Sequence, residues 1–288
     1  MFEEKEVTFP EVSSLKENPF IPEGEKPLGR KGFFIVVDGL DGVGKGEVER
    51  ALIAYEQKLR RAVFDTIAFS RANRKGLPEL HDFWNPPQTY FDTIVTAEPT
   101  YAGVGHNIRN EIIKNNSRKY SSEDEIQAYS MDRLIQMLRV VIPALKNNIR
   151  VLQVRCCAST LTYQIQRAKD EGKDQEEIKE RILKHEGNKL QLDWAPDLLI
   201  IPKIDNTEEL ISRLKSRGLM EKEDDAIFEN VKFQEKLAPL YTSTWLKELF
   251  ESHGTKVEYL NASISPEETR KQAVEIYKRF LERKDKFG

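Results

Sequence analysis

The stretch FFIVVDGLDGVGKGEVERAL, residues 33–52, decides the fold class of this chain. It starts with an apolar run typical of a buried strand, continues with three closely spaced glycines and a lysine, and ends in a helical pattern. The middle part fits G-x-x-x-x-G-K, a pattern in which backbone N–H groups and a helix N-terminus hold phosphate groups. A glycine-rich turn that binds nothing is the alternative, but here strand, loop, lysine and helix occur together. We therefore predict a strand, a phosphate-binding loop and a helix over residues 47–60.

Residues 39–46, called the phosphate loop below, are predicted to hold the phosphates of a nucleotide. Three glycines in this loop let N–H groups turn inward around an anion without a Cβ in the way. Lys45 can bridge the outer phosphates. Gly46 stands where the pattern has Ser or Thr, so the hydroxyl that usually holds Mg²⁺ is absent. The loss affects the placement of a metal, because the cradle itself consists of backbone N–H groups.

Four further apolar runs share the character of the first one. Each is rich in β-branched residues and mostly unalternated, as expected of strands that are covered on both faces. The five runs occupy residues 33–38, 93–98, 150–155, 197–204 and 256–262. Their alternation with helical patterns predicts an α/β fold with a parallel, doubly wound sheet and helices on both faces.

Helical patterns fill most of the chain between these runs. A Ser121 or Ser122 cap before Glu125 marks the start of the longest one, and Ser265 caps the last one before Pro266. The predicted helices beyond the first cover residues 104–115, 122–147, 207–217, 225–251 and 266–282.

The chain is predicted to form one domain, residues 32–284, behind an N-terminal polar arm, residues 1–31. The arm contains three prolines and shows no periodicity, which is typical of an extended or partly disordered segment. Two segments look inserted into the domain: residues 62–90, rich in proline and aromatic residues, and residues 164–194, rich in charge. Each segment is either a surface addition with no role in binding or a lid over the edge of the sheet where ligands bind. The second segment is the better candidate for a lid region.

Composition excludes several classes of protein. The net charge of −3 indicates no general attraction to nucleic acid or to a membrane surface. No apolar run approaches the roughly 18 residues that a membrane span needs, and the acidic N-terminus does not resemble a secretory signal. The two cysteines, Cys156 and Cys157, are adjacent and cannot form an ordinary disulfide framework. We expect a cytoplasmic protein with no nucleic acid and no membrane as a partner.

Several motifs in fixed order give the chain a family resemblance. They are DGLDGVGKGE (38–47), TAEPTYAGVGHNIRNEI (96–112), AYSMDRLIQM (128–137), VRCCASTLTYQ (154–164), PDL (196–198) and DNTEELISRLKSRG (205–218). Together they resemble the thymidylate kinases, P-loop enzymes that transfer a phosphoryl group from ATP to dTMP. The resemblance spans residues 32–281 apart from the two insertions. It implies a nucleoside monophosphate kinase fold whose five-stranded parallel sheet has the order 2-3-1-4-5, with ATP as co-substrate and Mg²⁺ as cofactor.

The resemblance also implies roles for individual residues. Lys45, Arg155 and a lid cation, with Arg167 as first candidate, would be catalytic. Arg133 would be a bidentate clamp on the acceptor monophosphate, with a surface arginine as the alternative. Arg155 ends a buried strand, where its charge needs a partner, and the same phosphate would supply it. Tyr129 would stack on the acceptor base, or else belong to the core. The residues implied for ATP are Gly39, Leu40, Asp41, Gly42, Val43, Gly44, Lys45 and Gly46. The residues implied for the acceptor are Asp41, Glu98, Tyr129, Arg133, Arg155, Thr160, Tyr163 and Gln164.

Three departures from the family pattern keep a second function open. Ala97 replaces the arginine before Glu98, Val154 replaces the aspartate before Arg155, and Gly46 replaces the hydroxyl residue. Because phosphoryl transfer depends on positioning and charge compensation, these changes fit either a dTMP kinase or a nucleotide-binding homologue with little or no activity. A kinase for another nucleoside monophosphate is a third possibility. Asp38 or Asp41 could hold Mg²⁺ through waters, and a homodimer through the 122–147 helix is expected from the family.

Overall fold

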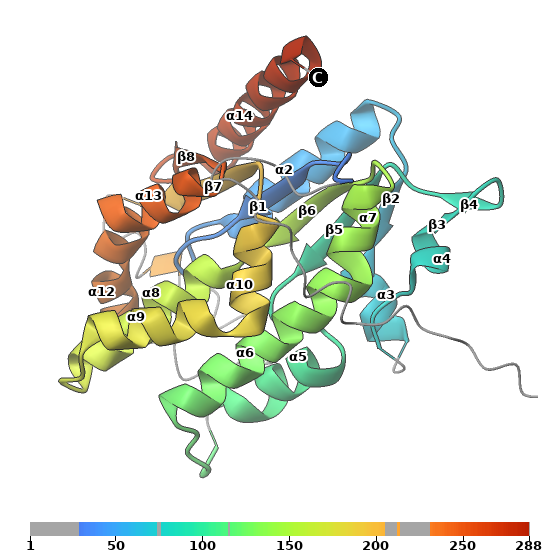
Figure 1. The fold of residues 1–288 in the computed structure, drawn as a ribbon. Coiled ribbons are helices and arrows are strands. Elements are labelled where there is room, and N and C mark those ends of the chain that lie inside the picture. The colour runs from blue at the N-terminus through green and yellow to red at the C-terminus, as the bar shows by residue number, and fades with distance from the viewer. Residues whose placement is uncertain (1–28, 74–75, 115, 205–211, 214–230, 288) are drawn as a thin grey trace, which may run out of the picture.

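The computed structural model describes residues 29–73, 76–114, 116–204, 212–213 and 231–287 (Figure 1). Most of the predicted N-terminal arm, most of the predicted 207–217 helix and the start of the 225–251 helix lie outside these residues. So does nearly all of the DNTEELISRLKSRG motif. No helix within the described parts has both the length and the apolar character that crossing a membrane requires.

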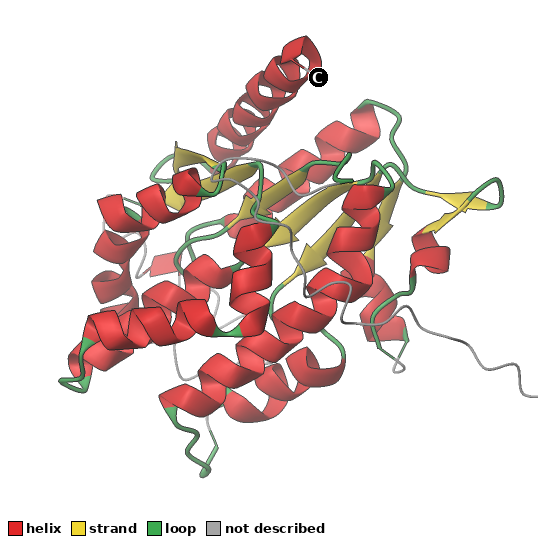
Figure 2. Ribbon diagram, viewed as in Figure 1, coloured by secondary structure: helices red, strands yellow, loops and turns green. Residues whose placement is uncertain are grey.

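One parallel sheet forms the centre of the molecule, with helices on both sides (Figure 2). Its strand order is β2-β5-β6-β1-β7-β8. The strands are β1 (Phe34–Val37), β2 (Val63–Asp65), β5 (Thr93–Ala97), β6 (Arg150–Val154), β7 (Leu198–Lys203) and β8 (Lys256–Asn261). The five predicted strands are confirmed, and they stand in the predicted order 2-3-1-4-5.

The sheet has six strands and not the predicted five. The extra strand, β2, comes from the 62–90 segment and pairs with β5 through Val63, Phe64 and Asp65. Its three residues are half-buried or exposed at the sheet edge, so no apolar run marked them in the sequence. The start of this segment is therefore part of the central sheet. Its remainder holds two short helices, α3 (Thr66–Ala72) and α4 (Leu80–Phe83), and a small hairpin, β3 (Trp84–Asn85) and β4 (Thr89–Tyr90).

The helices divide between the two faces of the sheet. Helix α2 (Lys45–Lys58) packs on β1 and β6 and against α14 (Pro266–Phe287) on one face. The other face carries most of the remaining helices (Figure 1). They are α6 (Ser122–Gln136), α7 (Ile142–Lys146), α8 (Cys157–Asp170), α9 (Gln175–Lys184), α10 (Glu186–Asp193), α12 (Val231–Tyr241) and α13 (Thr244–Ser252).

Two predicted helices contain a change of helical geometry. The 122–147 helix runs through α6, the π-helical turn η2 (Met137–Val141) and α7. The 104–115 helix consists of α5 (Gly103–Asn107) followed by the π-helical turn η1 (Ile108–Ile112). The predicted cap of α6 is confirmed: Ser121 Oγ accepts from the Asp124 N–H at 3.1 Å, and Asp124 Oδ2 accepts from the Ser121 N–H at 2.8 Å. Ser265 likewise accepts from the Glu268 N–H at 3.2 Å.

The residues just before β1 are fixed to the domain. The guanidinium of Arg30 donates to the Ala195 carbonyl at 2.7 Å and forms a buried ion pair with Asp197. Asp197 Oδ2 also accepts from the Phe34 N–H at 2.9 Å. Gly32 allows the backbone to pass Ile149, since a Cβ at this position would lie 2.1 Å from the Ile149 carbonyl oxygen. These contacts bring β1 and β7 into register at their amino ends, opposite the phosphate loop.

Candidate active site

The phosphate loop leaves the carboxyl end of β1 and leads into α2. Gly39, Gly42 and Gly44 have φ values of 151°, 76° and 98°, which side chains other than glycine rarely allow. The Lys45 ammonium bends back over the loop and donates to the carbonyls of Gly39 at 2.8 Å and Leu40 at 2.7 Å. The loop thus has the geometry of an anion cradle at a helix N-terminus, with its lysine held over it.

Asp38 joins the end of β1 to the start of α8. Its Oδ1 accepts from the Gly39 N–H and the Ser159 hydroxyl, both at 2.7 Å, and from the Tyr241 hydroxyl at 3.2 Å. Its Oδ2 accepts from the N–H groups of Cys156 at 3.0 Å and Ser159 at 3.1 Å. Because both oxygens of this fully buried carboxylate are occupied, Asp38 orients the loop and is poorly placed to hold Mg²⁺ through waters.

Asp41, inside the loop, is the centre of a second cluster. It forms an ion pair with Arg155 and accepts from the Tyr163 hydroxyl at 2.8 Å. Arg155 also donates to the Ser159 hydroxyl at 2.9 Å. Burial is the largest single effect on Arg155 and opposes its charge, but Asp41, Tyr163, Tyr241 and Asp38 together outweigh burial and hold the pKa of Arg155 well above its ordinary value. Burial, reinforced by Asp41, raises the pKa of Tyr163. The structure therefore brings Asp41, Lys45, Arg155 and Tyr163 together beside the phosphate loop.

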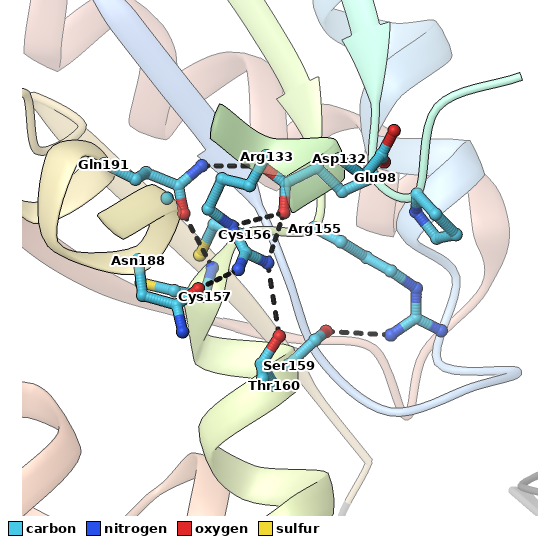
Figure 3. Close-up of polar contacts among 12 residues, drawn as sticks. Glu98, Asp132, Arg133, Arg155, Cys156, Cys157, Ser159, Thr160, Asn188 and Gln191 are labelled. Carbon is cyan, nitrogen blue, oxygen red and sulfur yellow. Dashed lines mark hydrogen bonds and ion pairs between the residues drawn. The ribbon is translucent and has the colours of Figure 1, made fainter. Parts of the chain in front are cut away.

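Glu98 and Arg133 form a separate, buried network (Figure 3). Arg133 donates to Glu98 Oε2 from Nε at 2.9 Å and from Nη2 at 2.6 Å, and also contacts Asn188 and Thr160. The other Glu98 oxygen accepts from the amide of Gln191 at 2.7 Å and from that of Gln153. Burial raises the pKa of Glu98, and Arg133 acts in the opposite direction. With 1% of its surface exposed, Arg133 is not a surface arginine.

The two predicted acceptor arginines have different contacts in this structure. The Arg133 guanidinium points to Glu98, Asn188 and Thr160, whereas the Arg155 guanidinium points to Ser159 and the phosphate loop (Figure 3). Their partners Ser159 and Thr160 are neighbours at the start of α8, and the Gln153 amide donates both to Glu98 and to the Arg155 carbonyl. A joint contact of both arginines with one acceptor phosphate stays a prediction.

The segment predicted as a lid is packed in this structure. It consists of the end of α8, with α9 and α10, and α10 supplies Asn188 and Gln191 to the buried network. Arg167 pairs with Glu125 on α6 at 2.6 Å and with Glu171 at 3.0 Å. Gln164 also donates to Glu125, at 2.8 Å. Arg167 and Gln164 therefore face α6 here, and their catalytic and acceptor-binding roles stay predictions.

Tyr129 lies among charges from several elements. Burial raises the pKa of Tyr129. Glu125 and Asp41 raise it further, whereas Arg155 and Arg109 lower it. These groups belong to η1, to α6, to the phosphate loop and to the end of β6. Stacking of Tyr129 on the acceptor base stays a prediction.

Two arginines beside the site were not singled out in the sequence. Arg109 donates to the carbonyls of Pro99 at 3.0 Å and Thr100 at 3.2 Å, and its guanidinium lies 3.9 Å from the centroid of the Tyr101 ring. Arg71, from α3, lies 4.3 Å from the same centroid. Arg109 stands inside the 96–112 motif, which could have identified it. Arg71 comes from the supposed insertion, and no sequence signal linked it to the site.

Other residues of the site were also missed, and glutamines dominate among them. Buried amides rarely carry a motif, and their partners become visible only when the chain is folded. The missed residues are Gln153, Asn188, Gln191, Gln234 and Tyr241, and the described side chains of all five are hydrogen-bonded.

The described side chains do not form a ready-made metal site. Within the described ranges, no group of three or more histidine, cysteine, aspartate or glutamate side chains could hold a metal ion. Asp41 is bonded to Arg155, Tyr163 and Gln234, and Gly46 has no hydroxyl. Protein ligands for Mg²⁺ therefore do not fit at this loop, and a water-mediated contact from Asp41 stays a prediction.

Comparison with known proteins shows the family to which this chain belongs. The family model described as thymidylate kinase matches residues 84–273, well over half of the chain. The chain belongs to the thymidylate kinase family. The match includes the Glu98–Arg133 network and Arg155, and it begins after the phosphate loop.

Relatives named as thymidylate kinases extend the comparison to the rest of the chain. A probable thymidylate kinase from Pyrococcus abyssi is 26% identical over 263 residues, 87% of this chain and 98% of the relative. The thymidylate kinase of Prochlorococcus marinus subsp. pastoris is 29% identical over 208 residues, 72% of this chain and 79% of the relative. A solved thymidylate kinase structure from Candida albicans has a TM-score of 0.58 at 17% identity, over 86% of this chain and 92% of that one. This structural likeness supports the shared fold.

Proposed function

We propose that this member of the thymidylate kinase family transfers the γ-phosphoryl group of ATP to dTMP and forms dTDP. One observation carries the proposal: the phosphate loop with Lys45 lies directly beside the Asp41–Arg155–Tyr163 cluster. A donor phosphate cradle and a cation suited to an acceptor phosphate thus share one edge of the sheet. Its relatives, which carry the name thymidylate kinase, support dTMP as the acceptor.

In this proposal each group has a defined task. The N–H groups of the phosphate loop and the N-terminus of α2 bind the phosphates of ATP. Lys45 exchanges its contacts with the Gly39 and Leu40 carbonyls for the outer phosphates. Arg155, whose side chain is 20% exposed, contacts the acceptor phosphate and places it in line with the donor. Mg²⁺ bound with ATP would supply further neutralisation of charge, and Asp41 would be the residue that reaches it through water.

Arg133 has a more indirect role in acceptor binding. Its contact with the Thr160 hydroxyl, at 3.2 Å, is the longest of its hydrogen bonds, and an acceptor phosphate could replace it. The paired Glu98 keeps the guanidinium oriented in the meantime. Arg133 would then complete an acceptor clamp that Arg155 begins.

A coupled assay of ADP release tests the proposal. We expect turnover with dTMP above that with dUMP, dGMP or dCMP, and a loss of about 10²-fold or more in turnover for Lys45→Met or Arg155→Ala. The exposed Lys184→Met variant is the matched control and should behave as the wild type. Absence of ADP release with every acceptor at high enzyme concentration would exclude a kinase.

A second candidate function is nucleotide binding with little or no turnover. The three departures from the family pattern, Gly46, Ala97 and Val154, favour it. Calorimetry that detects ADP or ATP binding without any phosphoryl transfer would support it. Val154→Asp is then informative, because Val154 lies at the end of β6 next to Arg155. A large gain in turnover would mean that the loss of this carboxylate had silenced the site.

The family resemblance and one exposed apolar stripe support a homodimer. Met131, Ile135 and Leu138 lie on one side of α6 and η2 and are 50%, 38% and 38% exposed. We include dimerisation through this stripe in the proposal. A cytoplasmic location is also part of it, because Cys156 and Cys157 are both free and buried.

A further inference from the structure

Helix α12 contacts the phosphate loop through two side chains of one face. Gln234 and Tyr241 are seven residues apart, which is about two helical turns. Gln234 reaches Asp41 inside the loop, and Tyr241 reaches Asp38 at its start. Both side chains are buried, with 0% and 2% of their surfaces exposed. The two aspartates on either side of Gly39 and Leu40 are therefore both bound by the same helix.

Gln234 binds both the backbone and the side chain of Asp41. Its amide oxygen accepts from the Asp41 N–H at 2.8 Å, and its amide nitrogen donates to Asp41 Oδ2 at 3.3 Å. The same nitrogen lies 3.2 Å from the Tyr163 hydroxyl, which itself donates to Asp41. One glutamine thus fixes the backbone of a loop residue and the direction of its carboxylate.

Tyr241 performs the corresponding task at Asp38. Its hydroxyl donates to Asp38 Oδ1 at 3.2 Å and lies 3.0 Å from the hydroxyl of Ser159. Asp38 also accepts from the Gly39 N–H. The helix therefore fixes the loop on both sides of Gly39, whose φ of 151° is a conformation that residues other than glycine rarely adopt.

We propose that α12 is a clamp that pre-organises the phosphate loop, with Gln234 and Tyr241 as positioning residues for nucleotide binding and phosphoryl transfer. A glycine-rich loop loses much conformational entropy when it closes around a ligand, and contacts that restrict it beforehand reduce that loss. The same contacts aim the Asp41 carboxylate at Arg155 and so set the orientation of the proposed acceptor contact. The inference deepens the proposed function and rests on it for the transfer step, but the effect on nucleotide binding can be measured separately.

Gln234→Glu and Gln234→Ala test the first contact. We expect about a tenfold loss of ADP affinity by calorimetry, and a comparable loss in kcat/KM for ATP, in Gln234→Ala. In Gln234→Glu a carboxylate would face Asp41, with Lys45, Arg155 and Tyr163 as the other titratable groups around it. A protonated glutamic acid restores one donor and one acceptor, so the ratio of variant to wild-type ADP affinity should rise as the pH falls from 8 to 6. Gln166→Glu, which places the same charge beside Asp170 on α8, should show no such trend.

Tyr241→Phe tests the second contact by removal of one hydroxyl. We expect a several-fold loss of ADP affinity. The matched control is Tyr277→Phe, since Tyr277 is also buried but its hydroxyl donates to Glu56 at 3.0 Å, away from the loop. That variant should keep the ADP affinity of the wild type even if its stability to urea falls.

The outcomes separate the clamp from the proposed function. Wild-type ADP affinity in both Gln234→Ala and Tyr241→Phe, or a Gln234→Glu ratio that does not change with pH, would overturn the clamp. A wild-type protein that binds ADP but transfers no phosphoryl group overturns the proposed function, and the clamp is then judged on ADP affinity alone. Loss of affinity in the two α12 variants, with both controls unaffected, supports the clamp.

Discussion

Glu49, on α2, is half-buried and differs from the buried carboxylates Glu98 and Asp38. Its Oε1 is buried and has no hydrogen-bond partner among the described residues. Glu98 and Asp38, by contrast, have both oxygens occupied. Burial, with the nearby Asp65 charge, raises the pKa of Glu49 from 4.5 to about 7. Glu49 therefore titrates near neutral pH in the folded protein.

The raised pKa makes stability depend on pH. Between about pH 4.5 and 7 the folded state binds more protons at Glu49 than the unfolded state does, so the free energy of unfolding falls as the pH rises through this window. Glu49→Gln removes the titrating group. We expect this variant to be more stable than the wild type by about 1–3 kcal/mol at pH 8, a difference that shrinks toward pH 4.5. Urea unfolding at several pH values measures this. Equal stability at pH 8, or the same gain in the exposed control Glu180→Gln, would contradict it.

Gly46 permits a direct test of the missing hydroxyl. A Cβ at this position would lie 3.5 Å from the nearest atom, the Nη1 of the exposed Arg50, so a serine fits without strain. We expect Gly46→Ser to increase the effect of Mg²⁺ on ADP affinity several-fold, because the new hydroxyl can act as a metal ligand. Calorimetry with ADP, with and without Mg²⁺, checks this. Gly46→Ala is the control without a hydroxyl. An equal Mg²⁺ effect in all three proteins would show that the hydroxyl is not needed here.

Single residues also show how far the candidate site could be predicted. Lys45, Asp41 and Arg155 were found because each stands in a local motif next to a buried strand, and the structure brings them together. Gln234 and Tyr241 come from a helix almost 200 residues away. No local pattern encodes such a contact, because it depends on how two distant segments pack.

At the scale of elements, the presence of an apolar run in the sequence decided which strands could be recognised. All four residues of β1 are buried, and runs of this kind stand out by their apolar character alone. Strand β2 forms only three pairs at the edge of the sheet and has no such run. The π-helical turn η2 within the long helix was also invisible, because its residues continue the apolar pattern on the buried side.

The contact of Arg30 with Asp197 fixes the start of β1 to the start of β7. Both side chains are 3% exposed, so Arg30→Ala removes the guanidinium from a buried carboxylate that Lys284 and the Phe34 N–H also contact. We expect a loss of about 3 kcal/mol in the free energy of unfolding, measured by urea denaturation. Arg118→Ala removes an exposed ion pair with Glu111 and should change stability little. Similar small effects for both variants would mean that the buried pair does not hold these strands together.

At the scale of the whole molecule, the exposed stripe on α6 predicts an association of two copies. We expect the wild type to be a dimer by light scattering and Ile135→Glu to be a monomer at micromolar concentration, since a charge in an apolar interface is costly. Gln127→Glu, one turn before Met131 on the same side of α6, is the matched control and should stay dimeric. A monomeric wild type, or a dimeric Ile135→Glu, would contradict the proposed interface.

The sequence by itself determined the phosphate loop, the five predicted strands and the family of this protein. These features depend on short-range chemistry: glycines that permit unusual φ values, apolar runs that must be covered, and motifs in a fixed order. The tertiary structure alone decided that Arg133 pairs with Glu98, that Asp38 joins β1 to α8 and that α12 binds the phosphate loop. A buried charge or amide takes whichever partner the packing brings within hydrogen-bond distance, and that partner can come from any part of the chain.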